Sequence, residues 1–374
     1  MKILINRDLL FFNLNNISRA LSTKPPMPVL TGIKIEARGN AVYLTASNNE
    51  ISIQTVIKDK KRLQIEEDGI VVVPGKYFIE IVKKIEAKEI DISTFENNVV
   101  KIVADRSLFS LNAYDKDDYP IISFNDSDVA ITMDVLNLKQ LIKKTTFAAS
   151  LSESRVILTG ISFATEGPKM EVVATDSYRL AKKFMVFEKE YPSIRAIIPS
   201  RSLDELHRIM DAPDENVEIH FSPLKVLFKY KNVLFQSRLI DGKYPDTSNL
   251  IPTEFHLSVK FNKNELIAAI ERASLFTTID STNIVKMKVN SDKTVEISST
   301  NNEIGAVKEE LVPLECSDPL NFEIAFSAKY FLDALRVFDS NEVSIHFTGE
   351  IKPFVITGFY DVNLTQLILP VRIS

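Results

Sequence analysis

The chain repeats itself, and the repeat is far longer than one turn of a solenoid. The separation between copies is about one third of the 374 residues, which indicates three copies of a whole small domain. Copies of one domain make an extended scaffold rather than a single catalytic cleft. The repeated runs are Leu30-Thr31-Gly32-Ile33 with Leu158-Thr159-Gly160-Ile161, Asn48-Asn49-Glu50-Ile51 with Asn301-Asn302-Glu303-Ile304, Lys76-Tyr77-Phe78 with Lys329-Tyr330-Phe331, and Asp118-Tyr119-Pro120 with Lys243-Tyr244-Pro245.

Composition agrees with three independently folded parts. The chain is 45% hydrophobic and 25% charged, as is ordinary for a globular protein, so each third can bury its own core. Polar, turn-rich junctions lie at 123–128 and 248–254. We therefore predict domains at 1–124, 125–251 and 252–374, joined by short connections that fix them side by side.

Each third has the same predicted order of elements. A short apolar strand leads into a helical stretch (7–22, 134–150 and 263–276), and alternating strands follow. A second short helix is expected at 76–87, 201–211 and 328–338, before further strands. The predicted fold class is α+β, with two helices packed on an antiparallel sheet in each of three similar domains.

The charge pattern gives two possible interpretations. A net charge of −5 argues against a protein that grips nucleic acid directly through a basic excess. The six helical stretches nevertheless carry more basic than acidic residues, among them Lys83, Lys84, Lys143 and Lys144. These lysines are either ordinary solvated positions or part of a diffuse positive surface for phosphates, which needs no base reading.

Motifs for chemistry are missing from the sequence. The four histidines have no metal-ligand spacing, and there is no Gly-rich phosphate loop, paired-cysteine motif or nucleophile elbow. We predict no cofactor, no metal site and no catalytic residue. An enzyme using Asp176 is the alternative, although no second carboxylate or base accompanies it in its motif.

The sequence predicts a cytoplasmic protein without a membrane partner. No apolar stretch approaches the roughly 20 residues needed to span a bilayer. The first seven residues reach a charge too soon for a signal peptide. Cys316 is the single cysteine, so no disulfide forms within the chain.

Three further motifs join the repeat and point to a family. They are Ala174-Thr175-Asp176-Ser177-Tyr178-Arg179-Leu180, the run 241–246, and the ending Leu369-Pro370-Val371-Arg372. Together they resemble the bacterial DNA sliding clamp, the beta subunit of DNA polymerase III, along the whole chain. The resemblance implies a non-catalytic processivity factor: two chains close head to tail into a ring around duplex DNA, with helices lining the hole.

The resemblance also implies a hydrophobic pocket between the second and third domains. Replicative polymerase subunits, the clamp loader and repair proteins would insert short linear peptides there. Two departures from the family pattern, Ser177-Tyr178 in place of Gly-His and Asn249 in place of an arginine, are expected to alter peptide preference. The implied pocket residues are Leu158, Thr175, Tyr178, Arg179, Leu180, Pro245, Leu250, Leu367, Leu369, Pro370, Val371 and Arg372.

Two more residue sets follow from the resemblance. The implied DNA-facing residues are Lys24, Lys83, Lys84, Lys143, Lys144, Ser152 and Arg155. The implied dimer interface joins basic and apolar residues of the first domain to apolar and acidic residues of the third, a sign pattern suited to a head-to-tail contact. That set is Lys76, Arg106, Phe109 and Leu111 with Leu275, Phe276, Glu303, Glu309 and Glu310.

Overall fold

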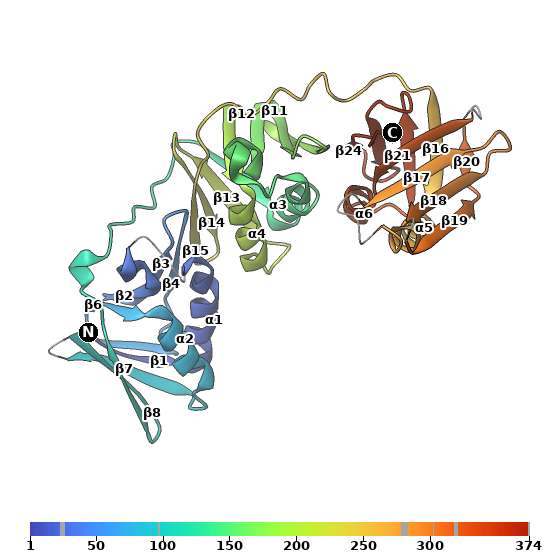
Figure 1. Ribbon diagram of the computed structural model, residues 1–374. Helices are drawn as coiled ribbons and strands as arrows, with labels where there is room; N and C mark the ends of the chain where they lie inside the picture. The colour runs from blue at the N-terminus through green and yellow to red at the C-terminus, as the bar shows by residue number, and fades with distance from the viewer. Residues whose placement is uncertain (23–26, 96–97, 278–282, 302, 318–320, 373–374) are drawn as a thin grey trace. The chain divides into compact units, whose positions relative to one another are not determined.

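The computed structural model describes the chain except residues 23–26, 96–97, 278–282, 302, 318–320 and 373–374 (Figure 1). Contacts among the described residues divide it into two compact units. The first unit is Met1–Leu138 with Arg201–Leu239, and the second is Lys139–Ser200 with Ile240–Ser374. The middle third of the sequence therefore contributes strands to both units. No described helix is both long and apolar enough to cross a membrane.

The first unit holds two antiparallel sheets with orders β5-β1-β7-β8-β9 and β10-β13-β14-β15-β4-β3-β2-β6. Strand β15 pairs with β4, Phe235 opposite Ile53, so the second sheet continues from the middle third into the first third. Its elements are β1 (Lys2–Asn6), α1 (Arg7–Ile17), β2 (Gly32–Arg38), β3 (Ala41–Ser47), β4 (Ile51–Ile57), β5 (Leu63–Glu67), β6 (Gly69–Pro74), α2 (Gly75–Lys84), β7 (Glu89–Phe95), β8 (Val99–Ala104), β9 (Ser107–Asn112), β10 (Ala130–Asp134), β13 (Asn216–Phe221), β14 (Lys225–Tyr230) and β15 (Val233–Arg238).

The second unit holds the sheets β11-β12-β24-β23-β22-β16-β20 and β19-β18-β17-β21. Here β12 pairs with β24, Leu180 opposite Leu367, which continues the middle third into the last third. The remaining elements are α3 (Val135–Lys143), β11 (Gly160–Thr175), β12 (Arg179–Pro199), α4 (Ser200–Ile209), β16 (Leu257–Asn262), α5 (Lys263–Ser274), β17 (Ile284–Val289), β18 (Val295–Asn301), β19 (Gly305–Leu311), β20 (Glu315–Cys316), β21 (Phe322–Ser327), α6 (Ala328–Arg336), β22 (Glu342–Phe347), β23 (Phe354–Gly358) and β24 (Leu364–Ile368); α3 and α4 extend across the sequence limits of the two units.

Side-chain caps fix where the helices begin. Asn6 accepts a hydrogen bond from the backbone N–H of Leu9, and Asn262 does the same for Glu265, so each satisfies a donor that the first helical turn leaves free. The apolar stripe of each helix packs inward. Helices α1 and α2 lie side by side, as do α5 and α6 (Figure 1).

The six helices lie where the sequence predicts them, but several end early. The stretch 7–22 leaves the α conformation at Ile17 and the stretch 134–150 at Lys143, each continuing into short 3-10 turns. A 3-10 turn keeps apolar residues about three apart, so periodicity alone does not separate it from an α-helix. The predicted α+β class, with helices packed on antiparallel sheets, is confirmed.

The sequence repeat is also a repeat of backbone geometry. The side chain of Asn48 accepts from the N–H groups of Glu50 and Ile51 at 3.1 and 2.9 Å. The carboxylate of Asp176 accepts from the residues two and three positions later at 2.9 and 3.0 Å, and Asn301 makes the same pair of bonds at 2.9 and 3.1 Å. One turn therefore recurs in all three thirds.

Candidate functional site

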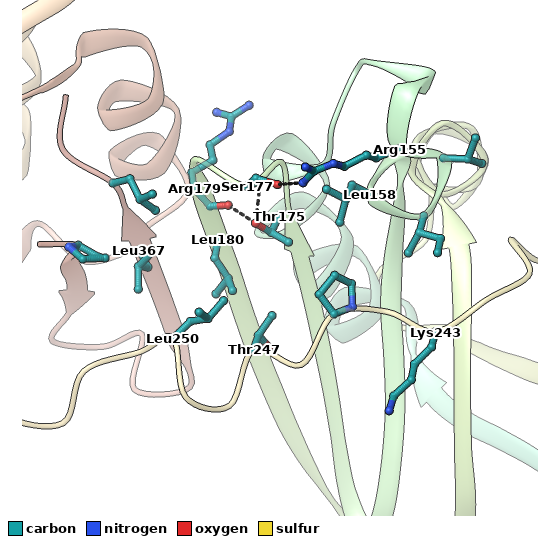
Figure 2. A pocket seen from close by; sticks show the side chains of 15 residues that line it. Arg155, Leu158, Thr175, Ser177, Arg179, Leu180, Lys243, Thr247, Leu250 and Leu367 are labelled. Carbon is teal, nitrogen blue, oxygen red and sulfur yellow. Dashed lines mark hydrogen bonds between the residues drawn. The ribbon is translucent and has the colours of Figure 1, made fainter. Parts of the chain in front are cut away.

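An apolar cavity of about 680 Å³ lies within the second unit (Figure 2). We call it the partner pocket. Residues from β11, β12, β24 and the connecting segments line it, and most of the lining is aliphatic. The lining residues are Arg155, Val156, Ile157, Leu158, Thr175, Ser177, Arg179, Leu180, Lys243, Pro245, Thr247, Leu250, Pro353, Leu367 and Leu369.

The floor of the partner pocket comes from the pairing of β12 with β24. Because side chains alternate along a strand, Leu180 and its partner Leu367 share one face and join a buried cluster with Val173 and Val355. Leu250 and Leu369 remain 50% and 37% exposed at the rim. The pocket thus has a fixed floor and apolar walls that are still open to a ligand.

A half-buried tyrosine holds the segment that forms one wall. The hydroxyl of Tyr244 accepts from the N–H of Thr175 at 3.0 Å. Burial raises the pKa of Tyr244, so the phenol stays neutral. Tyr244 therefore anchors Pro245 and Thr247, the next lining residues, beside strand β11.

Arg179 lines the pocket, but its charge is already paired. Its guanidinium donates to Asp176 at 3.0 Å and to Asp333 at 2.8 Å, and it stacks over the ring of Tyr330. Only 9% of its side chain is exposed. Arg155 and Lys243 are the other cations of the lining, and neither forms a salt bridge with a residue that the structure describes.

Arg155 is held by an unusual serine. Its Nη1 donates to the hydroxyl of Ser177 at 3.2 Å (Figure 2). Ser177 has φ +79°, a left-handed conformation that L residues other than asparagine and aspartate rarely adopt. The side chain of Ser177 therefore orients a cation in the pocket.

Eight of the predicted pocket residues line the cavity, and four do not. Tyr178 is exposed, and its carbonyl accepts from Leu369 at 2.9 Å. Pro370, Val371 and Arg372 follow outside the lining, and Val371 donates to Ala325 of β21 at 2.7 Å. The lining residues absent from the prediction are Arg155, Val156, Ile157, Ser177, Lys243, Thr247 and Pro353.

A sequence signal existed for some of the missed residues. Ser177 and Lys243 lie inside the motifs that carry the resemblance, and Val156 and Ile157 precede the repeated Leu158 directly. Pro353 reaches the pocket only because β23 lies next to β24. Nothing in its own sequence neighbourhood indicates that placement.

The predicted DNA-facing residues separate into several groups. Lys24 lies outside the described residues. Lys83, Lys84 and Lys143 are exposed in the last turns of α2 and α3, and Ser152 is exposed as well. Arg155 lines the partner pocket.

The prediction that Lys144 faces DNA is wrong. Helix α3 ends at Lys143, and the next side chain turns inward, with only 3% of it exposed. Its ammonium donates to Asp361 and, at 2.7 Å, to Asp339. Burial alone would raise the pKa of Asp361, but hydrogen bonds from Lys144 and Ser340 outweigh it and hold that pKa below its ordinary value. Lys144 is a structural residue of the second unit.

Four of the nine predicted interface residues lie on two edge strands. Phe109 and Leu111 lie half-exposed on β9, at the edge of its sheet, and Glu309 and Glu310 lie on β19, the edge strand of another. Glu309 already binds Arg272 through two hydrogen bonds of 2.6 and 2.5 Å, which hold its pKa below the ordinary value. The other predicted members, Lys76, Arg106, Leu275 and Glu303, are exposed, and Phe276 is half-buried.

Asp176 is engaged in structure rather than set up as a base. One oxygen accepts from the N–H groups of Tyr178 and Arg179, and the other accepts from the guanidinium of Arg179. Within the described part of the chain, no group of three or more histidine, cysteine, aspartate or glutamate residues is arranged to hold a metal ion.

Comparison with known proteins gives matches along the whole chain. Family models for the N-terminal, central and C-terminal domains of the DNA polymerase III beta subunit match residues 1–123, 132–246 and 248–372. Beta sliding clamps of Staphylococcus epidermidis and Staphylococcus aureus are 39% identical to this chain over 376 aligned positions, covering 100% of this chain and 99% of each relative.

Solved structures match equally well. The DNA polymerase sliding clamp of Bacillus subtilis has a TM-score of 0.97 at 39% identity, with 100% of both chains covered. The DNA polymerase III beta chain of Streptococcus pneumoniae has a TM-score of 0.96 at 33% identity, again over 100% of both chains.

These matches show that the chain belongs to the DNA polymerase III beta subunit family and that it consists of three beta-clamp domains. The resemblance seen in the sequence is thereby confirmed. The function of the chain is that of a bacterial beta sliding clamp, a processivity factor for DNA polymerase.

Proposed function

We propose that two copies of this chain close head to tail around duplex DNA and hold partner proteins through the partner pocket. The observation that carries the proposal is an open apolar pocket in a chain that matches the clamp family from end to end. We place the three domains at 1–124, 125–251 and 252–374. Each range contains most of one family-model match.

Edge strands β9 and β19 supply the proposed contact between copies. An edge strand presents unpaired backbone donors and acceptors, which favour addition of another strand. Phe109 and Leu111 on β9 would meet Leu275 and Phe276 of the other copy. Exposed Lys76 and Arg106 would face Glu303 and Glu310, so opposite charges meet across the contact. Glu309 would join them with its charge already partly compensated by Arg272.

DNA contacts in this proposal are few and diffuse. Lys83, Lys84 and Lys143 are exposed cations on helices, and Ser152 adds a neutral donor. Such contacts read phosphate rather than bases, and they weaken as salt rises. The chain is therefore retained on DNA by enclosure, because direct affinity is small for a protein of net charge −5.

The partner pocket suits a short peptide with apolar side chains. Its 680 Å³ lies in the range of small-ligand sites, roughly 300–1,000 Å³. Leu250 and Leu369 stand open at the rim, above the floor formed by Leu180 and Leu367. A few such anchors carry most of the energy of peptide binding. We assign polymerase subunits, the clamp loader and repair proteins as the sources of these peptides.

We further propose that the chain carries no catalytic step and acts in the cytoplasm. Both carboxylate oxygens of Asp176 are occupied by structural hydrogen bonds, which counts against the enzyme alternative. A role beside the replicative polymerase requires the compartment that contains the chromosome.

Primer extension on a long single-stranded circle tests this function. The assay contains DNA polymerase III and the clamp loader of the same organism, with and without the chain. The chain should convert short products into long ones at a single polymerase binding event. Product lengths that do not change when the chain is added would contradict the proposal.

A further inference from the structure

The partner pocket has a counterpart in the first unit. A smaller cavity of about 140 Å³ lies where the first third meets the strands of the middle third, and we call it the junction pocket. Leu30 lines it as Leu158 lines the partner pocket, and Pro120 takes the place of Pro245. Both pairs belong to the runs that repeat in the sequence.

Backbone geometry supports this equivalence in detail. Asn49 in the junction pocket has φ +79°, the same value as Ser177 in the partner pocket. The N–H of Arg238 donates to the carbonyl of Glu50 at 2.9 Å, just as Leu369 donates to Tyr178 at 2.9 Å. Strand pairing agrees as well, because Ser52 lies opposite Gln236 where the partner pocket has Leu180 opposite Leu367.

The two pockets differ in chemistry. Where the partner pocket has Leu180, Leu367 and Leu369, the junction pocket has Ser52, Gln236 and Arg238. The cavity is therefore polar, and it has room for about one side chain rather than for several. An aliphatic side chain bound there would gain little from leaving water, because it would cover polar groups and leave them without hydrogen-bond partners.

Two features of the junction pocket suit a ligand with hydrogen-bond acceptors. Gln236 is only 6% exposed, and its side chain lines the cavity. A glutamine amide carries two N–H donors, which can bind an acceptor that enters the cavity. Lys225 and Arg238 lie opposite each other on β14 and β15, and neither forms an ion pair with any described residue. Glu50 is the one acidic residue of the lining, so the cations are in excess.

We propose that the junction pocket binds the carboxylate side chain of an acidic peptide segment. Lys225 and Arg238 would bind the carboxylate oxygens, and the amide of Gln236 would donate the third hydrogen bond. Half-exposed Ile122 and the fully open Ile121 would cover the adjoining backbone of the peptide. The choice of a peptide rests on the proposed peptide role of the equivalent partner pocket, whereas the need for an anion rests on the junction pocket itself.

Methyl NMR of the full chain tests the proposal, because Ile121 and Ile122 report directly on the cavity. The probe is an end-blocked Gly-Asp-Gly peptide, and its Gly-Asn-Gly analogue has the same shape without the charge. The acidic peptide should shift both isoleucine signals in a saturable way. Lys225→Gln, Arg238→Gln and Gln236→Leu should each weaken it about tenfold, the loss of one charge-assisted or buried hydrogen bond.

Lys58→Gln is the matched control, since Lys58 is exposed beyond the opposite end of β4 and should leave the titration unchanged. Unshifted signals of the remaining isoleucines show that each variant is folded. Absence of shifts at Ile121 and Ile122, equal binding of the asparagine peptide, or insensitivity to all three variants would overturn the proposal. Shifts produced by a short DNA duplex but not by the peptide would overturn the assignment to a peptide. Leu250→Ala should leave this titration intact, so a failure of the partner pocket is distinguishable.

Discussion

Lys144 and Asp361 form a buried ion pair that joins the residue after α3 to the loop between β23 and β24. Each side chain is only 3% exposed. Asp361 also accepts from the backbone and hydroxyl of Ser340, and Gln366 donates to the carbonyl of Lys144 at 3.2 Å. Parts of the chain from two sequence repeats are thereby tied together inside the second unit.

Replacing Lys144 should destabilise the protein strongly. Lys144→Met leaves Asp361 buried without its charged partner, which costs about 3–5 kcal/mol. Lys143→Met is the matched control, because the neighbouring lysine is exposed and its loss should stay within about 0.5 kcal/mol. Urea unfolding of the two variants measures the difference. Equal free energies of unfolding would contradict the structural role assigned to Lys144.

The same pair predicts a dependence of stability on acid. The pKa of Asp361 in the folded protein lies below its ordinary value of 3.8. The contribution of this carboxylate to the free energy of unfolding is therefore complete above pH 3.8 and is lost as the pH falls through the lowered pKa. Asp339, Lys144 and the nearby Lys183 are the charged groups facing it. The gap in unfolding free energy between the wild type and Asp361→Asn should therefore be largest near neutral pH and shrink in acid. A difference in unfolding free energy that stays constant with pH would show that Asp361 stabilises the protein through its packing and not through its charge.

Truncating a rim residue of the partner pocket should weaken peptide binding without unfolding the protein. Leu250 is half exposed, so Leu250→Ala removes an anchor and little core. We expect a loss of about 2 kcal/mol in binding of a polymerase-derived peptide, measured by fluorescence anisotropy. Leu224→Ala, which removes a leucine that is 71% exposed in the first unit, should change nothing. Equal affinities for the two variants would place the peptide elsewhere.

Charge placed in the proposed interface should separate the copies. Phe276→Asp and Leu111→Asp each put an unpaired carboxylate into an apolar contact, at a cost of several kcal/mol. Sedimentation should show folded monomers for both variants, while Val186→Asp, at an exposed position on β12, should remain dimeric. A dimer that survives both changes would rule out the edges β9 and β19 as the contact.

The sequence predicts the architecture well because each copy of the repeat contains short local motifs that determine its turns and helices. Asn48, Asp176 and Asn301 each direct the same turn through their own side chains, so a local motif suffices to find them. Apolar periodicity likewise finds all six helices. It overestimates the lengths of α1 and α3 most, since the 3-10 turns that follow them share the spacing of the apolar residues.

The site is predictable only in part, because residues far away in the sequence decide which charged side chains are paired and buried. Lys143 and Lys144 look alike in sequence, and the partner that buries Lys144 lies 217 residues away. The leucines of the partner pocket follow from family resemblance, whereas Pro353 enters through strand order. The junction pocket becomes visible only when the two strand pairings, β4 with β15 and β12 with β24, are compared.

Retention on DNA before and after linearisation tests the central claim most directly. The chain is loaded onto a nicked circular plasmid by the clamp loader, freed of unbound protein in high salt, and the plasmid is then cut once. Enclosure predicts that the chain stays on the circle in salt that abolishes its binding to linear DNA, and that it leaves when the circle is cut. Equal retention on the circular and the linearised plasmid would contradict it, because the chain would then be held by direct affinity.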